Sequence, residues 1–322
     1  MKIIKSDVSV LEQQPGIEGM FKHIERVGRI AYKSEDRITE DSWKKFVKMI
    51  YERGHHAVFN LGTVYLRIPK STVNSAENEF FEKITEEFKP WTKWAYNNGY
   101  NYVTTNFRVI CQTGTYNDMV KYWCEPTEHH YHKITAHWVC SRGTATQILR
   151  HRVLSPVMES QRYCNYSKNK FSGELTYILP QWVYDVREDY GTTIDTLTGR
   201  LRSHLLDLDG QELWDELTCW SRKVSSRDKF FKAAEDEYMY ELSEEDGKLS
   251  PEDARGVLPQ DIKTELCTCG YISDWMYEPK EDSTEKAGFF YLRTAPDAQR
   301  DVRVLAEKLK KDFIKLGLDK LK

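Results

Sequence analysis

The chain has 322 residues, of which 40% are hydrophobic and 30% are charged, and its formal net charge at pH 7 is −3. This composition is typical of a globular protein and excludes a chain that is disordered throughout. The negative net charge gives no overall electrostatic attraction to nucleic acid. No apolar run approaches the ~20 residues that cross a bilayer. We therefore expect neither nucleic acid nor a membrane as a partner.

The cysteines and the first residues bear on the cellular compartment. The seven cysteines form no regular framework, and the apolar stretch after Met1 is too short for a signal peptide. Reduced thiols in a cytoplasmic protein are the expectation.

Apolar spacing predicts two helices and a strand in the first part of the chain. Residues 16–33 and 41–53 place apolar side chains on one face at helical intervals, and Gly54 ends the second helix. Residues 63–68 alternate as a strand does. Residues 70–130 are helical, polar and aromatic by turns. Their aromatic stretch favours core packing or a subunit interface over base stacking: Trp91, Trp94, Tyr96, Tyr100 and Tyr102.

The second part of the chain mixes both kinds of element. Strands are predicted at residues 131–140 and 172–182, and helices at 141–152, 192–244, from Ser250-Pro251 onward, and from about Asp297. The order shows no regular β-α-β alternation. It favours an α+β fold in one domain, with a central mixed or antiparallel sheet and helices around it.

The segment from residue 147 to 163 carries the most informative chemistry. Three arginines and a histidine lie within 13 residues. Arg150 and His151 directly follow apolar helix positions, and partly buried arginines there need anionic or π partners. Pro156 is expected to break the helix and leave residues 158–162 as a turn. Its free N–H groups, the Ser160 hydroxyl and the Arg162 fork would make a phosphate cradle. A solvated basic helix end is the alternative, and the residues alone leave both open.

This segment resembles a family signature. Arg150-His151-Arg152, followed after seven residues by Ser160, resembles the RHR-x7-S motif of flavin-dependent thymidylate synthases (ThyX). Residues 54–59, 254–259 and 289–293 are similar to further family segments, in the family's order. The resemblance spans about residues 20 to 310. It implies a ThyX-like fold in a single domain over residues 1–322, with charged or aromatic insertions near 70–130 and 278–288.

The resemblance implies an activity and its cofactors. The family methylates dUMP reductively to dTMP, with 5,10-methylenetetrahydrofolate as carbon donor, NADPH as reductant and FAD as cofactor. No cysteine nucleophile is needed. The resemblance also implies a homotetramer with shared active sites.

The resemblance implies roles for particular residues as well. Arg293 would lie beside the pyrimidine edge as the catalytic residue, where a guanidinium favours the N3-deprotonated uracil and makes C5 more nucleophilic. The residues that would hold dUMP are Gln147, Arg150, Glu159, Ser160, Gln161, Arg162, Arg255 and Arg293. Those that would hold FAD are His55, Ala57, Arg150, His151, Arg152, Val153, Tyr271 and Ser273.

The chain departs from the family pattern at three places. Met158 stands where Glu or Gln is usual, so one polar contact is missing or displaced onto Glu159. Ala57 replaces a hydroxyl residue near the expected flavin. Residues 270–275 replace an Asn-x-Arg element that touches the adenosine half of FAD. Stacking of Tyr271 on adenine and a hydrogen bond from Ser273 are the expected substitutes.

Other interpretations stay open beside this one. A related enzyme could add a different one-carbon group, such as hydroxymethyl, and a non-catalytic nucleotide-binding homologue could have lost FAD. Cys164 as a nucleophile is disfavoured because cysteines are commonly buried and inert. No metal is expected at the histidines of residues 129–137, because alternate residues of a strand point to opposite faces and no carboxylate cluster completes a site.

Overall fold

The structure, a computed structural model, describes residues 1–71, 75–168, 173–182, 192–194, 201–203, 211–243, 248–280 and 287–321, with backbone only for 192–194, 201–203 and 211–221. These residues fall into two compact units. Unit 1 comprises Met1–Ser6, Cys140–Thr146 and Ser160–Thr264. Unit 2 comprises Asp7–Val139, Gln147–Glu159 and Glu265–Lys322. A single domain over the whole chain stays a prediction, as do the two insertions, of which residues 281–286 lie outside the described residues.

A three-stranded antiparallel sheet forms one part of unit 2. Its order is β3-β5-β4, with β3 at Thr63–Pro69, β4 at Lys93–Asn97 and β5 at Tyr100–Asn106. Asn98 and Gly99 join β4 to β5 with φ of 45° and 82°, which is the backbone of a tight hairpin turn. The short helices beside this sheet are α3 (Ala76–Thr85), α4 (Phe107–Thr113) and α5 (Tyr116–Tyr122).

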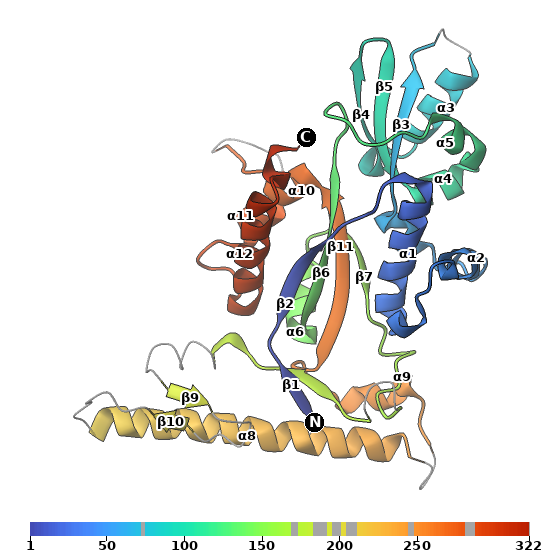
Figure 1. The fold of residues 1–322 in the computed structure, drawn as a ribbon. Coiled ribbons are helices and arrows are strands. Elements are labelled where there is room, and N and C mark those ends of the chain that lie inside the picture. The colour runs from blue at the N-terminus through green and yellow to red at the C-terminus, as the bar shows by residue number, and fades with distance from the viewer. Residues whose placement is uncertain are drawn as a thin grey trace. The chain divides into compact units, whose positions relative to one another are not determined.

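The second sheet has the order β2-β6-β11-β7 (Figure 1), with β2 at Asp7–Leu11, β6 at Lys133–Ser141, β7 at Ser155–Met158 and β11 at Lys263–Tyr271. Strand β2 runs antiparallel to β6, and β7 antiparallel to β11. Within unit 2, helix α12 (Arg300–Lys315) packs against β2 and α1 (Gly16–Tyr32) against β7. Two short helices, α10 (Ile272–Met276) and α11 (Phe289–Arg293), contact each other beside α12.

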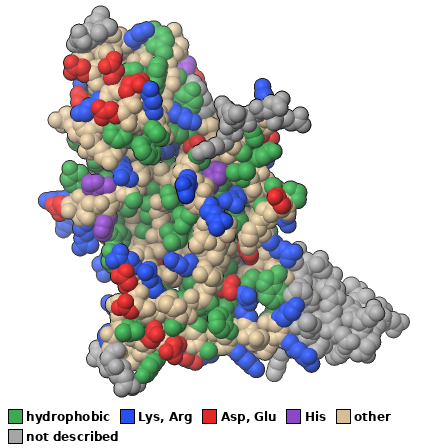
Figure 2. Space-filling view, turned by 180° about the vertical axis from the view of Figure 1, so that it is seen from behind, with side chains coloured by type: hydrophobic (Ala, Val, Ile, Leu, Met, Phe, Trp, Pro, Cys, Tyr) green, Lys and Arg blue, Asp and Glu red, His purple; other side chains and the backbone are tan. Residues whose placement is uncertain are grey.

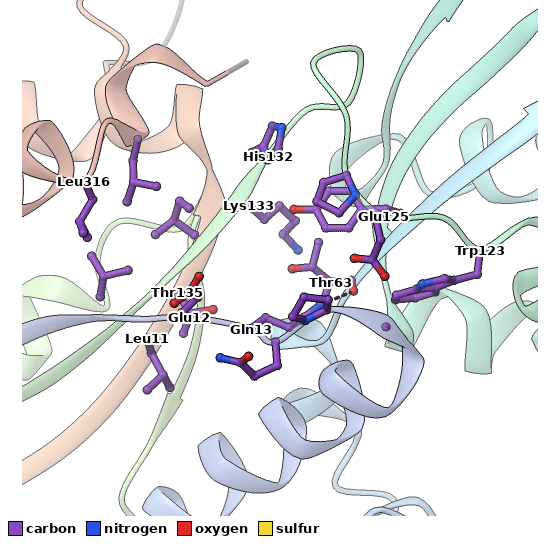
Figure 3. A pocket seen from close by; sticks show the side chains of 18 residues that line it. Leu11, Glu12, Gln13, Thr63, Trp123, Glu125, His132, Lys133, Thr135 and Leu316 are labelled. Carbon is purple, nitrogen blue, oxygen red and sulfur yellow. Dashed lines mark hydrogen bonds between the residues drawn. The ribbon is translucent and has the colours of Figure 1, made fainter.

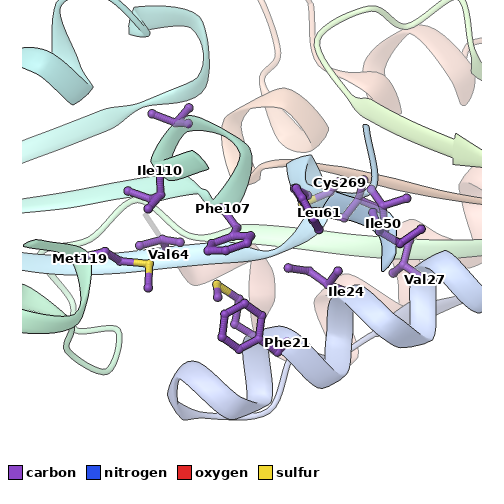
Figure 4. Close-up of a cluster of buried hydrophobic side chains, with 14 of the residues drawn as sticks. Phe21, Ile24, Val27, Ile50, Leu61, Val64, Phe107, Ile110, Met119 and Cys269 are labelled. Carbon is purple, nitrogen blue, oxygen red and sulfur yellow. The ribbon is translucent and has the colours of Figure 1, made fainter. Parts of the chain in front are cut away.

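The main hydrophobic core of unit 2 lies under helix α1 (Figure 4). Met20, Ile24 and Val27 on its inner face are fully buried, as the helical spacing predicts. Gly28 lets α2 (Ser42–Glu52) approach closely, because a Cβ at this position would lie 2.6 Å from the Phe46 ring. Burial of each large side chain here contributes on the order of 2 kcal/mol.

Unit 1 is built around a long helix. Its elements are β1 (Lys2–Ile4), β8 (Thr176–Ile178), β9 (Thr192–Ile194), β10 (Leu201–Ser203), α8 (Gln211–Glu241) and α9 (Pro251–Ala254). Strands β1 and β8 pair in parallel, and β9 pairs antiparallel with β10. Strands β6 and β11 and helix α6 (Arg142–Ile148) have residues in each unit. The described chain is therefore α+β, with antiparallel pairing in both larger sheets and a parallel pair in unit 1.

The predicted elements are largely confirmed, with corrections where the local signal was weak. Both early helices, the strand at 63–68, the strand at 131–140 and the cap at Ser250 are present. The last helix begins at Arg300, because the Gln299 side chain accepts the N–H of Val302 and caps it there. The prediction of helix over 192–244 is wrong at its start, where β9 and β10 pair as antiparallel strands, and its residues 195–200, 204–210 and 244 lie outside the described residues.

The aromatic stretch divides between core and surface. Tyr102 is buried at 7% exposure, whereas Trp91, Trp94 and Tyr96 are 43–53% exposed. Core packing is therefore confirmed for Tyr102, whereas Trp91, Trp94 and Tyr96 are not core residues of this chain, and a subunit interface stays the prediction for them. Trp94 and Tyr96 are alternate residues of β4 and point to the same, exposed side of the strand.

Two buried histidines make unit 2 sensitive to acid. Burial lowers the pKa of His23 and of His130 to about 4 each, because the charged imidazolium loses its hydration. The unfolded chain takes up these protons near pH 6.5, so stability is fully present above that pH and is lost as the pH falls toward 4. Each histidine is expected to cost up to roughly 3 kcal/mol at pH 4.

Urea unfolding at pH 7.5 and pH 4.5 measures this loss. The variants His23→Gln and His130→Gln should each be less stable at pH 7.5 but lose less stability between the two pH values. A wild-type-sized loss in both variants would contradict the assignment.

Candidate functional site

The basic segment begins on helix α6. Ser141 caps this helix, because its Oγ accepts the N–H of Thr144 at 3.1 Å. The helix ends at Ile148, so the expectation that it reaches Arg152 is wrong. The backbone instead turns at His151, whose N–H donates to the Ile148 carbonyl at 3.0 Å, and enters strand β7 at Ser155.

Strand β7 also corrects the expected turn at residues 158–162. Met158 pairs with Leu266 of β11 and is the last residue of the strand. Pro156 is tolerated there on the edge strand of the sheet. The turn lies further along the chain, from Ser160 to Cys164. There the N–H groups of Tyr163 and Cys164 donate to the Ser160 carbonyl at 3.2 and 3.0 Å.

Four of the predicted site residues come together in unit 2. Arg293, at the end of helix α11, donates from Nη2 to the Gln147 carbonyl at 3.1 Å. Burial lowers the pKa of Arg293, and the neighbouring charge of Arg150 lowers it further. Burial likewise lowers the pKa of His151, with Arg293 adding to the effect. The charge effects among Arg150, His151 and Arg293, and the contact of Arg293 to the Gln147 backbone carbonyl, place these four residues in one cationic cluster.

This cluster carries polar atoms that the described chain leaves unsatisfied. Within the described residues, the buried His151 Nε2 and Arg293 Nε have no hydrogen-bond partner. Buried polar groups are nearly always paired, so these two nitrogens are candidates for hydrogen bonds to a ligand. The His151 ring packs edge-on against Phe289 at 5.3 Å and is 8% exposed. A neutral ring held in this way can hydrogen-bond to a planar heterocycle through Nε2.

The remaining expected flavin residues differ in how they are held. The Tyr32 hydroxyl contacts His55 Nδ1, and the two rings stack with centroids 6.1 Å apart. Ala57, on the short 3-10 helix His56–Leu61, and Arg152 are exposed, and Val153 is 43% exposed. These side chains are open to a ligand, whereas His55 is oriented by Tyr32.

Tyr271 lies in a different environment from the one expected. Its ring is 4% exposed, and its hydroxyl donates to the backbone carbonyls of Thr104 and Trp91 at 2.8 and 2.9 Å. The burial raises the pKa of Tyr271 well above its ordinary value. A ring enclosed in this way offers no face to adenine, which argues against the expected stacking. Ser273 is exposed, and Lys93 donates to its hydroxyl at 2.7 Å.

Glu159 also makes its hydrogen bonds inside unit 2. Its N–H donates to the Glu265 carbonyl at 2.8 Å, and its Oε2 accepts the N–H of Glu265 at 3.2 Å. Although burial disfavours the ammonium of Lys33, Glu159 and Glu265 raise its pKa. Glu265 also accepts from His137 at 2.8 Å. The Glu159 carboxylate therefore helps to join β7 to β11. This use argues against the expectation that Glu159 makes the ligand contact that Met158 lacks.

In unit 1, the turn at Ser160 presents a second cationic group. Arg162 Nε lies 2.8 Å from Glu252 Oε1, and Arg255 Nη2 lies 3.9 Å from the same oxygen. Gln161 is 4% exposed, and its Nε2 has no hydrogen-bond partner among the described residues. The structure thus brings together Arg162 and Arg255, which are 93 positions apart in the sequence.

The cysteine thiols and His130 are surrounded by protein groups. Cys164 is fully buried in the apolar cluster of unit 1. Burial raises the pKa of Cys111 to about 12. The pKa of Cys124 is raised to about 11, and burial is the largest cause. The cysteines with described side chains are free thiols. His130 contacts the Leu66 carbonyl at 3.1 Å, and no group of metal-ligand side chains occurs among the described residues.

A cavity of about 560 Å³ opens elsewhere in unit 2. Figure 3 shows Trp123 and Glu125 on one side of it and Leu11 and Leu316 on the other. Its volume suits a small ligand. Its lining holds the carboxylates of Glu12 and Glu125 against the ammonium of Lys133 and includes none of the predicted site residues. Two carboxylates against one cation disfavour a nucleotide phosphate, so we do not place the nucleotide here.

Charged side chains of both signs are mixed on the visible surface. On the face shown in Figure 2, Lys and Arg lie beside Asp and Glu over much of the described chain. None of the described helices is long and apolar enough to cross a membrane.

Some residues that contact the predicted groups were not identified from the sequence. They are Tyr32 beside His55, Lys93 beside Ser273, and Glu252 between the two arginines. Each comes from a segment distant in sequence or carries no motif of its own. The spacing of Glu252 to Arg255, one helical turn, was the single local signal available.

Comparison with known proteins supports the signature. The family Thy1, described as thymidylate synthase complementing protein, matches residues 103–316, about two thirds of the chain. The match contains every predicted site residue except His55 and Ala57. No curated protein matches the chain.

Solved structures with similarity to the chain include two crystal structures of the UMP/dUMP methylase PolB from Streptomyces cacaoi. The one bound with 5-Br dUMP is 12% identical, with 98% of this chain and 93% of that chain covered and a TM-score of 0.36. The one bound with 5-Br UMP is 12% identical, with 98% and 92% covered and a TM-score of 0.38. Scores this low carry no weight for the fold or activity of this chain.

Proposed function

Since the chain belongs to the Thy1 family of thymidylate synthase complementing proteins, we propose that it is a flavin-dependent thymidylate synthase with a ThyX-like fold. It converts dUMP to dTMP, taking the carbon from 5,10-methylenetetrahydrofolate and reducing equivalents from NADPH. One observation carries the proposal most directly. Four residues of the family-matched segment converge in a cationic cluster with two buried, unsatisfied nitrogens.

The pyrimidine of dUMP is proposed to meet Arg293, Gln147 and Arg150. Arg293 is already fixed through its Nη2 contact to the Gln147 carbonyl, so its unpaired Nε remains for the base. A guanidinium at the pyrimidine edge stabilises the N3-deprotonated uracil and raises electron density at C5. This activation needs no thiol, in keeping with the raised pKa of Cys111 and Cys124 and the apolar burial of Cys164.

The phosphate of dUMP is proposed to meet Arg162, Arg255, Ser160 and Gln161. Two arginines that converge on one oxygen suit a phosphate, because guanidinium groups donate several parallel hydrogen bonds. We also propose a cytoplasmic homotetramer with shared active sites, in which the groups acting on one nucleotide can come from different chains.

FAD, when bound, supplies the redox chemistry that completes the methyl group. The residues that fit it are His151, whose Nε2 is unpaired, and His55, which Tyr32 orients, with the exposed Ala57, Arg152 and Val153 and with Arg150. At the expected adenosine end, the burial of Tyr271 leaves Ser273 and Lys93. The Lys93 ammonium supplies a cation beside Ser273, where residues 270–275 contain no arginine.

The test is an anaerobic incubation of the purified protein with FAD, dUMP, methylenetetrahydrofolate and NADPH, with the nucleotide product read by mass. We expect dTMP, and its loss when any one addition is omitted. A hydroxymethylated nucleotide would replace the proposal with a related one-carbon transfer. No product, together with no change in the flavin spectrum on titration with FAD, would leave a nucleotide-binding protein without the cofactor.

A further inference from the structure

The arginines Arg162 and Arg255 already hold an anion that belongs to the chain. Both lie within 4 Å of the same carboxylate oxygen of Glu252, at 2.8 and 3.9 Å. Arg162 comes from the turn after Ser160, whereas Glu252 and Arg255 lie on and just after helix α9. Glu252 therefore bridges two segments that are remote in sequence.

The surroundings of this bridge indicate a binding site rather than a surface ion pair alone. Gln161, next to Arg162, is 4% exposed and leaves its Nε2 without a partner among the described residues. Such a buried donor is costly unless something accepts from it. Two arginines that share one carboxylate oxygen, with an unused amide donor on the residue before Arg162, match the needs of a phosphate, which accepts through several oxygens.

Glu252 is free to leave without disturbing the fold. Its side chain is 44% exposed, and those of Arg162 and Arg255 are 53% and 36% exposed. The cap of helix α9 is made by Ser250, which accepts the N–H of Asp253 at 3.3 Å, so the helix start does not depend on Glu252. Rotation of the Glu252 side chain into water costs little, because an exposed ion pair is weak.

We propose that Glu252 occupies the position of a phosphate monoester in the ligand-free protein and lowers the affinity for that group by competing for Arg162 and Arg255. The inference rests on the proposed function only in naming the phosphate as that of dUMP. A phosphate monoester carries close to two negative charges at pH 7 against one for the carboxylate, so it displaces Glu252 from the two guanidinium groups. The resident carboxylate thus weakens phosphate binding but does not prevent it.

The experiment compares Glu252→Gln with wild type by calorimetric titration of dUMP, deoxyuridine and inorganic phosphate. The variant should bind dUMP and phosphate about two- to fivefold more tightly, the range expected from removing one exposed ion pair, with deoxyuridine unchanged. Asp253→Asn is the matched control, because it removes the same charge on the next residue without an arginine contact. It should leave all three affinities as in wild type.

Other results would overturn the inference. An equal gain for deoxyuridine, an equal gain in Asp253→Asn, or weaker binding in Glu252→Gln would each exclude competition by Glu252. If wild type binds phosphate but not dUMP, the proposed function fails, and the phosphate titration of the two variants still decides the role of Glu252. Circular dichroism melts check that both variants are folded.

Discussion

Replacing Arg293 with alanine is expected to lower kcat by about 10²-fold or more while FAD still binds. The guanidinium is the group proposed to stabilise the deprotonated uracil, and removal of one such preorganised electrostatic group typically costs this much. Its place on α11 and its contact to the Gln147 carbonyl hold it in position before substrate arrives. The loss should therefore appear in turnover more than in cofactor affinity.

The stability of this variant gives a second readout. Arg293 is partly buried beside Arg150, and both influences lower its pKa, so the fold holds this cation at a cost. Its removal relieves the repulsion, and we expect the melting temperature to stay level or rise. A residue that lowers stability but is needed for turnover is typical of an active site.

Arg303→Ala is the control for general loss of a positive charge. Arg303 lies on α12, donates to the Pro296 carbonyl at 2.7 Å, and is outside the cationic cluster. Its kcat should match wild type. Near-normal turnover in Arg293→Ala, measured with dUMP and folate saturating, would remove Arg293 from the mechanism.

Replacing Arg255 with alanine is expected to raise the Kd for dUMP by about 10- to 100-fold. A charge-assisted hydrogen bond is worth roughly 1.5–3 kcal/mol, and each 1.4 kcal/mol is a tenfold change in Kd. Arg162 would remain, so binding should weaken rather than disappear. Arg162→Ala should have a similar effect, and the double variant a larger one.

Comparison with deoxyuridine makes this result specific. The nucleoside lacks the phosphate, so its Kd should not change in Arg255→Ala or Arg162→Ala. Arg222→Ala, which removes an exposed arginine on α8, serves as the control in the same unit. A parallel loss for dUMP and deoxyuridine would show that Arg255 shapes the site as a whole and does not read the phosphate.

Tyr271 and Glu159 differ most from what their sequence positions predicted. Glu159 was expected at a ligand because it lies in the family signature, and Tyr271 because it stands in the segment that replaces the Asn-x-Arg element. Both side chains are used inside unit 2. The Tyr271 hydroxyl reaches Thr104, 167 positions away, and Glu159 pairs with Glu265, 106 positions away. Contacts at such separations depend on which strands pair, and no local pattern contains that information.

The cationic clusters show the opposite outcome. Arg150 and His151 were singled out because charged side chains after apolar helix positions are hard to explain by packing. The structure places them with Arg293, and it places Arg162 with Arg255. The need for anionic partners followed from the residue types, whereas the grouping of the residues followed from the fold.

Local patterns in the chain were sufficient to predict the helices α1, α2 and α12, the strand β3, the cap at Ser250 and the family. These depend on apolar spacing, turn residues and a motif, all of which act over a few residues. The end of α6, the burial of Tyr271 and the position of Glu252 between two arginines emerged only from the folded chain. The physical reason is that burial and charge pairing are set by groups brought together from distant segments, whose free energies no local window of sequence contains.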